Sequence, residues 1–305
     1  MALIECVPNF SEGRRREVID EIAAAVAGVA GVGLLDRQSD ETHNRCVLTF
    51  VGEHEAAAEA AFRAVAAAAR LIDLNQHQGA HPRFGATDVV PFVPIRAGDM
   101  PACVGTAHQL GRRVAAELQI PVYFYEEAAR SPERRNLAAV RAGEFEGLRK
   151  VIGTDPSRAP DEGPPHIHPT AGAVAIGARP PLIAYNVNLV SDDLELARRI
   201  AREVRERDGG LPKVKAIGLA LERGVQVSMN LVDYRVTGVM EAYAAVRDRA
   251  AVAGVEVAES EVVGLLPLDA LVGLGRAAVH AGAFSDRQVL EARVLDRYLE
   301  RSESS

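Results

Sequence analysis

The spacing of apolar residues near the start of the chain recurs about 180 residues later. In both places an apolar pair begins an expected strand, Leu3-Ile4 in the first copy and Leu182-Ile183 in the second. A serine followed by acidic residues comes next, at 11–12 and 191–193, and this combination favours the start of a helix. The following apolar positions are spaced by four, which predicts one buried stripe on each helix: Val18, Ile22 and Val26, then Leu196, Ile200 and Val204.

The rest of each copy repeats the same order of elements. Two apolar strands, a second helix and two short apolar strands are expected at 32–35, 47–51, 55–70, 71–74 and 89–92, and again at 214–221, 225–231, 236–253, 255–258 and 262–265. This βαββαβ order is that of ferredoxin-like domains. The sequence therefore predicts an α+β protein with a duplicated ferredoxin-like unit: two subdomains, 1–178 and 179–305, each with a sheet and helices packed on one face.

Residues 154–181 separate the two copies and hold seven of the 16 prolines. Their spacing has no helical period, so an irregular connecting segment over or between the halves is expected. A connection of this length in a compact protein is more often functional than idle. The segment is therefore a candidate for ligand binding.

Composition and charge narrow the class of protein. The chain has 305 residues, 48% of them hydrophobic, and a net charge of −7, so no basic surface for nucleic acid is expected. No apolar run approaches the roughly 20 residues that span a bilayer, and the N-terminus lacks the basic region of a secretory signal. The three separated cysteines, Cys6, Cys46 and Cys103, are expected to be small buried side chains. These features predict a cytoplasmic protein with small-molecule partners and no membrane association.

The first copy contains two insertions that the second copy lacks. The turn at 36–45 is five residues longer than its counterpart, and the region at 75–88 is longer by eleven. Both are rich in His, Arg and Asp. Polar loops added to only one of two similar units predict a functional site on that unit, although surface loops are polar in any case.

The insertions favour acid–base chemistry over metal chemistry. His77 and His81 are four residues apart, but Gly79 and Pro82 disfavour the helix that would place them on one face. His166 and His168 have no accompanying Cys or acid pattern, and no nucleotide-binding or serine-hydrolase motif occurs. Histidine suits proton transfer near neutral pH, and Arg45 and Arg83 are either carboxylate ligands or solvated surface cations.

Six segments resemble the glutamate formimidoyltransferase family, which includes the formiminotransferase domain of the bifunctional formiminotransferase-cyclodeaminases. The resemblance covers nearly the whole chain. The segments are ECVPNFSEG within 4–13, HQGAHPRFGA at 77–86, TFVG at 49–52, PVYFY at 121–125, RAGE at 141–144 and YNVNL at 185–189.

The resemblance implies transfer of the formimino group from N-formimino-L-glutamate to N5 of tetrahydrofolate, a late step of histidine breakdown, with His81 at the catalytic position. Tetrahydrofolate is then a co-substrate, no cofactor or metal is needed, and a homodimer is expected. The resemblance also implies a folate-binding segment at the junction of the subdomains: Gly163, Pro164, Pro165, His166, Ile167, His168, Pro169, Thr170, Ala171 and Gly172. This segment departs from the family pattern of Phe-Gly-Pro followed by Ser and Phe.

The remaining site assignments follow from charge and location. Asp40 or Asp36 is expected to stabilise the cationic formimino carbon, and the expected substrate-binding residues are Arg45, Arg83, His43, Asn9 and Asn188. Two alternatives stay open: a metal-dependent hydrolase of formyl- or formimino-glutamate that uses His77, His81, His166 and His168, and a non-catalytic folate-binding protein. The two copies and their helices account for the chain through 286–298, so no separate cyclodeaminase domain is expected.

Overall fold

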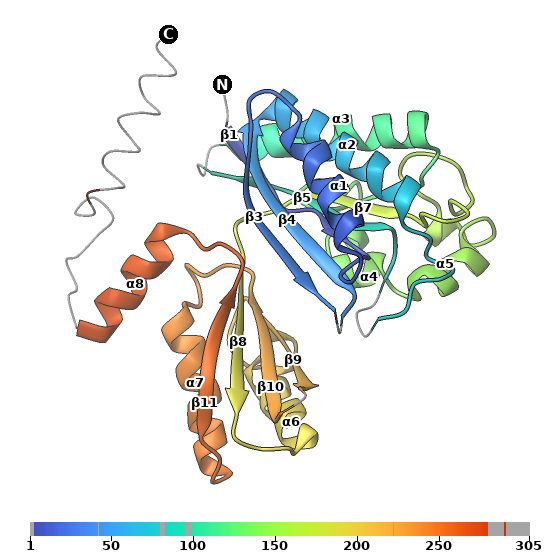
Figure 1. Ribbon diagram of the computed structural model, residues 1–305. Coiled ribbons are helices and arrows are strands. Elements are labelled where there is room, and N and C mark those ends of the chain that lie inside the picture. The colour runs from blue at the N-terminus through green and yellow to red at the C-terminus, as the bar shows by residue number, and fades with distance from the viewer. Residues whose placement is uncertain are drawn as a thin grey trace. The chain divides into compact units, whose positions relative to one another are not determined.

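The computed structural model describes residues 3–41, 43–79, 83–95, 99–221, 223–279 and Leu290. The chain divides into two compact units, Met1–Arg179 and Pro180–Ser305. Each unit has its own sheet, its own helices and its own hydrophobic core (Figure 1). The predicted α+β class is confirmed.

The first unit is built on a seven-stranded sheet. Its strands are β1 (Leu3–Cys6), β2 (Asn9–Phe10), β3 (Val32–Asp40), β4 (Arg45–Glu53), β5 (Thr87–Pro94), β6 (Val122–Glu126) and β7 (Val174–Ala178). The short strands β1 and β2 lie between β4 and β5 and are antiparallel to both, and β3 pairs with the other side of β4. Beyond β5, strands β7 and β6 continue the sheet in parallel.

Three long helices cover one face of this sheet: α1 (Arg16–Ala27), α2 (His54–Leu71) and α3 (Met100–Leu118). They lie side by side in Figure 1, and α2 packs against both of the others. The predicted stripe of α1 is confirmed, since Val18, Ile22 and Val26 are at most 6% exposed. The short elements η2 (Pro132–Arg134), α4 (Leu137–Val140), α5 (Glu144–Val151) and η3 (Pro156–Arg158) lie between β6 and β7 in the chain.

The second unit has a four-stranded sheet of order β11-β8-β10-β9. Its elements are β8 (Ile183–Leu189), α6 (Leu194–Val204), η4 (Glu206–Asp208), β9 (Val214–Ala220), β10 (Val225–Leu231), α7 (Val239–Val252), β11 (Val257–Val263) and α8 (Leu268–Val279). Asp193 caps α6 by accepting the N–H of Leu196, and the predicted stripe of Leu196, Ile200 and Val204 is buried. The pairing sequence β9-β10-β8-β11 has the same form as β3-β4-β1-β5 in the first unit.

Several expected boundaries were wrong. Residues 71–74 are not a strand, because α2 runs to Leu71 and the chain then continues without strand pairing. In the second unit, the two strands expected at 255–258 and 262–265 both contribute to a single strand, β11. The expected turn at 36–45 is mostly strand, since β3 continues to Asp40 and β4 begins at Arg45. The additional residues therefore lengthen a hairpin. Ser11 does not cap α1, which begins five residues later at Arg16.

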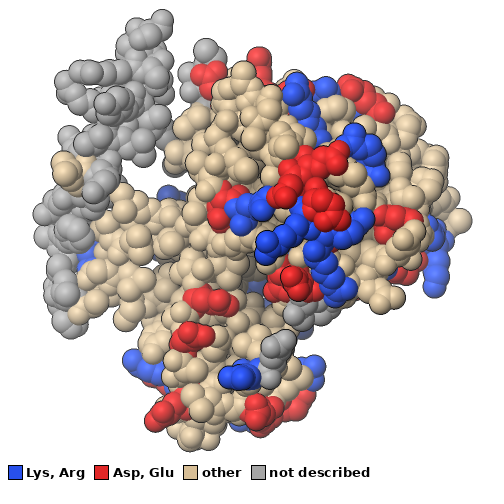
Figure 2. Space-filling model, in the orientation of Figure 1, with Lys and Arg blue, Asp and Glu red and all other residues tan. Residues whose placement is uncertain are grey.

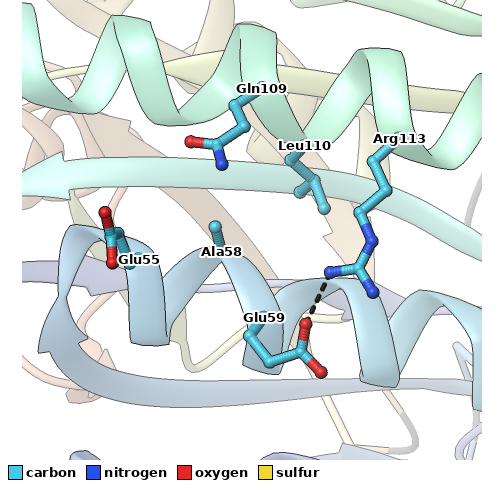
Figure 3. A pocket seen from close by; sticks show the side chains of 6 residues that line it. All are labelled: Glu55, Ala58, Glu59, Gln109, Leu110 and Arg113. Atoms are coloured by element: carbon cyan, nitrogen blue, oxygen red, sulfur yellow. Dashed lines mark hydrogen bonds and ion pairs between the residues drawn. The ribbon is translucent and has the colours of Figure 1, made fainter.

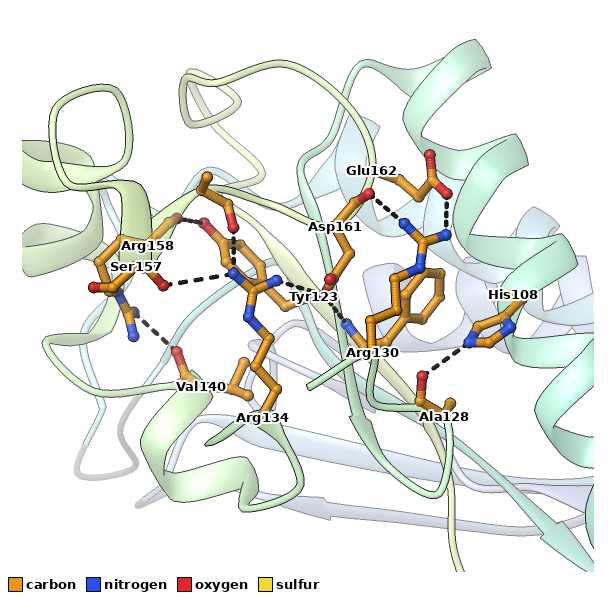
Figure 4. Close-up of polar contacts among 12 residues, drawn as sticks. His108, Tyr123, Ala128, Arg130, Arg134, Val140, Ser157, Arg158, Asp161 and Glu162 are labelled. Atoms are coloured by element: carbon orange, nitrogen blue, oxygen red, sulfur yellow. Dashed lines mark hydrogen bonds and ion pairs between the residues drawn. The ribbon is translucent and has the colours of Figure 1, made fainter. Parts of the chain in front are cut away.

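The connecting segment 154–181 is not wholly irregular, because it contains the buried parallel strand β7. A strand that is buried on both faces is a continuous apolar run without alternation, and the flanking prolines made this one resemble a loop. Residues 158–161, which precede β7, are held against β6 and η2 by hydrogen bonds and an ion pair, as Figure 4 shows. Tyr123 Oη donates to the Arg158 carbonyl at 2.6 Å, and Asp161 accepts the Phe124 N–H at 2.8 Å and pairs with Arg134 at 2.7 Å.

Acidic and basic side chains are interspersed on the face of the molecule shown in Figure 2. Neither sign forms an extended surface of its own in this view. Among the helices that the structure describes, none is long and apolar enough to cross a membrane.

Candidate functional site

The inserted region 75–88 is held near both of its ends by hydrogen bonds to residues 170–172. Just before it, the Leu74 N–H donates to the Thr170 carbonyl at 2.9 Å. Near its end, the Ala86 N–H donates to the Ala171 carbonyl, also at 2.9 Å, and Gly85 pairs with Gly172. Both ends therefore lie beside residues 170–172.

The first half of the insertion is attached to the tip of the β3–β4 hairpin. His77 Nε2 donates to the Asn44 carbonyl at 2.9 Å, and Asn44 Nδ2 donates to the Gln78 carbonyl at 2.9 Å. Burial lowers the pKa of His77 below its usual value. A Cβ on Gly79 would lie 2.4 Å from the carbonyl oxygen of His43, so the two segments are in close backbone contact.

The second half is attached to β5 and to residues 11–13, which follow β2 and form the opening turn of the chain. Ser11 Oγ donates to the Gly85 carbonyl at 2.8 Å, and the Ser11 N–H donates to the Ala86 carbonyl at 2.9 Å. Asp88, 2% exposed, accepts the N–H of Phe84 at 2.7 Å. These contacts fix the residues on either side of 80–82.

Asp88 is the centre of a buried charged cluster. Its carboxylate pairs with Arg141 at 2.7 Å. Burial raises the pKa of Asp88, while Arg141 and then Arg45 oppose the rise. Burial also lowers the pKa of Arg45, with Asp88 and Asp40 opposing and Arg141 reinforcing that change. The sequence prediction included Arg45 but missed Asp88 and Arg141, because nothing in their spacing distinguishes them from structural charges.

Arg83 is the first described residue after 80–82, and it already has an acidic partner. Its guanidinium pairs with Glu146 of α5 and lies 5.9 Å from the ring centre of Phe145. The Arg83 side chain is 20% exposed. A substrate carboxylate would have to compete with Glu146 for this group.

Asp40 and His43 form a pair at the tip of the hairpin. The Asp40 carboxylate accepts the His43 N–H at 2.8 Å and lies 2.8 Å from His43 Nδ1. Nearby, Glu12 accepts the N–H groups of Arg14 and Arg15, each at 2.9 Å. Burial alone would raise the pKa of Glu12, but these hydrogen bonds and Arg15 lower it. A carboxylate and an imidazole therefore lie next to the inserted region.

Residues 163–172 approach the site through their second half. His168 and Gly172 exchange two main-chain hydrogen bonds, and His168 Nδ1 accepts the Ala171 N–H at 3.0 Å. Burial lowers the pKa of His168. Gly163, at the other end, has a φ of 91° and packs near the Ile120 carbonyl. Thus 168–172 lies beside the insertion, whereas Gly163 contacts the start of β6.

Two predicted substrate-binding residues differ in their location. Asn9 lies on β2 between β4 and β5, and its Nδ2 donates to the Val7 carbonyl at 2.9 Å. Asn188 belongs to the second unit, where its Nδ2 donates to Glu259 at 3.2 Å and its Oδ1 accepts from Gln226 at 2.9 Å. Asn9 is therefore part of the sheet that carries the insertion, and Asn188 is part of the other sheet.

His81, the predicted catalytic residue, lies outside the described residues, as does all of the expected last helix at 286–298 except Leu290. Within the described ranges, no group of three or more His, Cys, Asp or Glu side chains is arranged to hold a metal ion. The three cysteines are buried and unpaired by disulfides, as expected.

A separate hollow of about 360 Å³ lies between α2 and α3 and contains none of the predicted site residues. Figure 3 shows its lining side chains, which include an ion pair between Glu59 and Arg113 at 2.5 Å. Arg113 also lies 3.6 Å from the ring centre of Phe62. Glu59 and Arg113 of the hollow are therefore engaged in internal contacts.

The sequence matches two family models along its length: the N-terminal subdomain of the formiminotransferase domain at residues 3–179, and the formiminotransferase domain at residues 184–288. A glutamate formimidoyltransferase of Thermoplasma acidophilum is 46% identical, with 96% of this chain and 98% of that protein covered. One from Streptococcus pyogenes serotype M1 is 44% identical, covering 96% and 99%.

A formimidoyltransferase-cyclodeaminase of Sus scrofa is 46% identical over 88% of this chain and 51% of that protein, so the chain spans about half the length of this bifunctional relative. These matches agree with the transferase interpretation and not with the hydrolase or non-catalytic alternatives. The chain belongs to the formiminotransferase family.

Proposed function

We propose that this chain is a glutamate formimidoyltransferase. It transfers the formimino group from N-formimino-L-glutamate to N5 of tetrahydrofolate and releases 5-formimino-tetrahydrofolate and glutamate. The observation that carries the proposal is the similarity, over nearly the full length of both chains, to two proteins of that name. The structure supports the proposal in one respect: hydrogen bonds attach Gln78 on one side of His81, and residues 84–88 on the other, to the first unit.

The proposed reaction requires proton transfer and orientation of two substrates. The formimino group is protonated on nitrogen as an amidinium, and N5 of tetrahydrofolate attacks its electrophilic carbon to form a tetrahedral adduct. His81 takes the proton that N5 loses and returns it to the departing glutamate nitrogen, after which the carbon–nitrogen bond breaks. One imidazole therefore balances both proton transfers, and positioning of the two reactants supplies much of the acceleration.

The charged groups around the insertion suit the other steps. Asp40 is proposed to stabilise the cationic formimino carbon and adduct, with its orientation fixed by His43. Arg45, which is partly buried, is proposed to bind a substrate carboxylate, and Arg83 would do so by exchanging Glu146 for that carboxylate. His43, Asn9 and Asn188 remain proposed substrate contacts.

Residues 163–172 are proposed to bind folate. The half that lies against the insertion, 168–172, would bring the pterin ring near His81, because its main chain bonds to both ends of the insertion. Tetrahydrofolate acts as a co-substrate, and the proposed reaction uses no metal. We also propose a homodimer located in the cytoplasm, for which light scattering of the purified protein is the direct test of the oligomeric state.

Product analysis tests the proposed function. The purified chain is incubated with N-formimino-L-glutamate, with or without tetrahydrofolate, and with or without a metal chelator. We expect glutamate and 5-formimino-tetrahydrofolate in equal amounts, only when tetrahydrofolate is present, and unchanged by the chelator. Glutamate release without tetrahydrofolate that stops with chelator would identify a metal-dependent hydrolase instead. Binding of both substrates with no product in a single turnover would identify a non-catalytic protein.

A further inference from the structure

Asn44, at the tip of the β3–β4 hairpin, has an unusual conformation for a buried residue. It is 7% exposed, and its φ of 49° lies in the left-handed region, which asparagine tolerates better than most side chains. A buried side-chain amide requires hydrogen-bond partners, and Asn44 has them on two separate segments. The sequence prediction assigned this residue no role.

The side chain of Asn44 connects the opening turn of the chain to the insertion. Its Oδ1 accepts the Gly13 N–H at 2.8 Å, and its Nδ2 donates to the Gln78 carbonyl at 2.9 Å. Its main-chain carbonyl accepts from His77 Nε2 at 2.9 Å. One residue thus bonds to Gly13 on one side and to two consecutive residues of the insertion on the other.

The third hydrogen bond also fixes the tautomer of His77. A carbonyl oxygen only accepts, so Nε2 carries the proton and Nδ1 is the unprotonated nitrogen of the neutral ring. Nδ1 is buried and has no hydrogen-bond partner among the described residues. Burial lowers the pKa of His77, which favours the neutral form of the ring. The orientation of this imidazole therefore depends on the backbone position of Asn44.

Two glycines leave no space for the hairpin tip to shift. A Cβ on Gly13 would lie 2.2 Å from the Asp40 carbonyl oxygen, and a Cβ on Gly79 would lie 2.8 Å from the Cβ of Asn44. Such distances are shorter than any normal contact. The tip is therefore packed between Gly13 and Gly79, and the hydrogen bonds of Asn44 set its register against both.

We propose that Asn44 is a positioning residue for formimino transfer. It fixes residues 77–79, which lead directly into His81, relative to the opening turn and to the Asp40–His43 pair. This inference rests on the proposed function, because the expected loss of turnover is measured in the formimino-transfer reaction. Orientation errors near 1 Å are sufficient to lower turnover by about a hundredfold, so the loss of these bonds should reduce turnover strongly.

Two substitutions separate the contacts of Asn44. Asn44→Asp keeps an oxygen for the Gly13 N–H but replaces the donor to Gln78 with an oxygen that repels its carbonyl. Asn44→Gly keeps the left-handed backbone and removes both side-chain bonds. We expect each variant to lower kcat by about tenfold or more while the KM for each substrate changes by less than about threefold.

Gln119 provides a matched control within the same unit. It also has a left-handed backbone, with a φ of 55°, and its side-chain amide makes two hydrogen bonds, to the carbonyls of Ala115 and Ala116 at the end of α3. Gln119→Gly therefore removes a similar set of contacts far along the chain from the insertion. Its kcat is expected to stay within about twofold of the unmodified chain, because its bonds do not reach residues 77–79.

Amide hydrogen exchange of peptides covering 74–79 gives a readout that does not require activity. Exchange should quicken in both Asn44 variants and stay unchanged in Gln119→Gly. If the unmodified chain transfers the formimino group but both Asn44 variants keep kcat within about twofold, or if their exchange is unaltered, the positioning role is wrong. If the unmodified chain transfers no formimino group, the proposed function fails, and the exchange measurement still tests whether Asn44 holds residues 77–79.

Discussion

The ring of His168 is expected to hold residues 168–172 in their folded conformation. Its Nδ1 accepts the N–H groups of Ala171 at 3.0 Å and Thr170 at 3.3 Å. A ring nitrogen accepts only when it is unprotonated, so this conformation requires neutral His168 with its proton on Nε2. Substitution at this position therefore tests whether these two hydrogen bonds stabilise the proposed folate-binding segment.

The expected magnitude follows from the two acceptor contacts. His168→Ala leaves two N–H groups without their acceptor, and a net contribution of about 1 kcal/mol for each bond gives about 2 kcal/mol in total. For a unit of this size, 1 kcal/mol corresponds to about 2–4 °C in the midpoint of thermal unfolding, so we expect a fall of about 4–8 °C. His168→Asn offers a side-chain oxygen in place of Nδ1 and should lie within about 2 °C of the unmodified chain.

Acid should affect the unmodified chain more than His168→Asn. Burial lowers the pKa of His168 in the folded chain, so on acidification the unfolded chain takes up the proton first. Stability therefore falls as the pH drops through about 6.5, the usual histidine value, and the loss ends below the folded pKa. Because other titrating groups, including His77, are common to both chains, the difference between them isolates His168.

Thermal unfolding followed by circular dichroism, at about pH 7.5 and about pH 5.5, measures both effects. The proposed role of His168 is refuted if His168→Asn unfolds at as low a temperature as His168→Ala. It is also refuted if the unmodified chain and His168→Asn lose equal stability on acidification. Either result would mean that Nδ1 does not anchor the segment.

Two further substitutions test how the insertion is supported. Gly85→Ala would place a Cβ 1.9 Å from the carbonyl oxygen of Ala173, so we expect unfolding at a temperature at least about 5 °C lower. Gly105→Ala is the control, because a Cβ added at this position within α3 would have open space around it, and it should be neutral or stabilising in the same scan. Equal effects of the two substitutions would contradict the close packing at Gly85. Asp88→Asn leaves the largely buried Arg141 without its anionic partner and should cost about 3 kcal/mol in urea unfolding, and a cost below about 1 kcal/mol would show that the pair is not important for stability.

The sequence predicted the elements whose apolar spacing is regular. The stripes on α1 and α6 were correct in detail, because a helix that buries one face must place apolar residues at every third or fourth position. Strand β7 was missed because a strand buried on both faces has no alternation to detect. The hairpin extension after Leu35 was mistaken for a turn because polar residues continue the strand beyond the core.

The candidate site was only partly predictable for a related reason. The comparison of the two copies located the insertion correctly, since residues 72–86 connect α2 to β5 in the first unit whereas only 253–256 connect α7 to β11 in the second. The roles of Asn44, Asp88 and Arg141 depend on contacts between residues far apart in the chain, and no local pattern indicates such contacts. Sequence alone also placed Arg83 as a substrate ligand without its partner Glu146.

The catalytic role of His81 is decided by the turnover of His81→Ala. We predict that this variant binds tetrahydrofolate as the unmodified chain does and loses turnover by about two or more orders of magnitude, the usual scale for a missing general base. His108→Gln is the matched control, because His108 lies on α3 and its Nε2 donates to the Ala128 carbonyl at 2.8 Å, outside the insertion. Turnover of His81→Ala close to that of the control, measured as formation of 5-formimino-tetrahydrofolate, would contradict a catalytic role for His81 and the mechanism built on it.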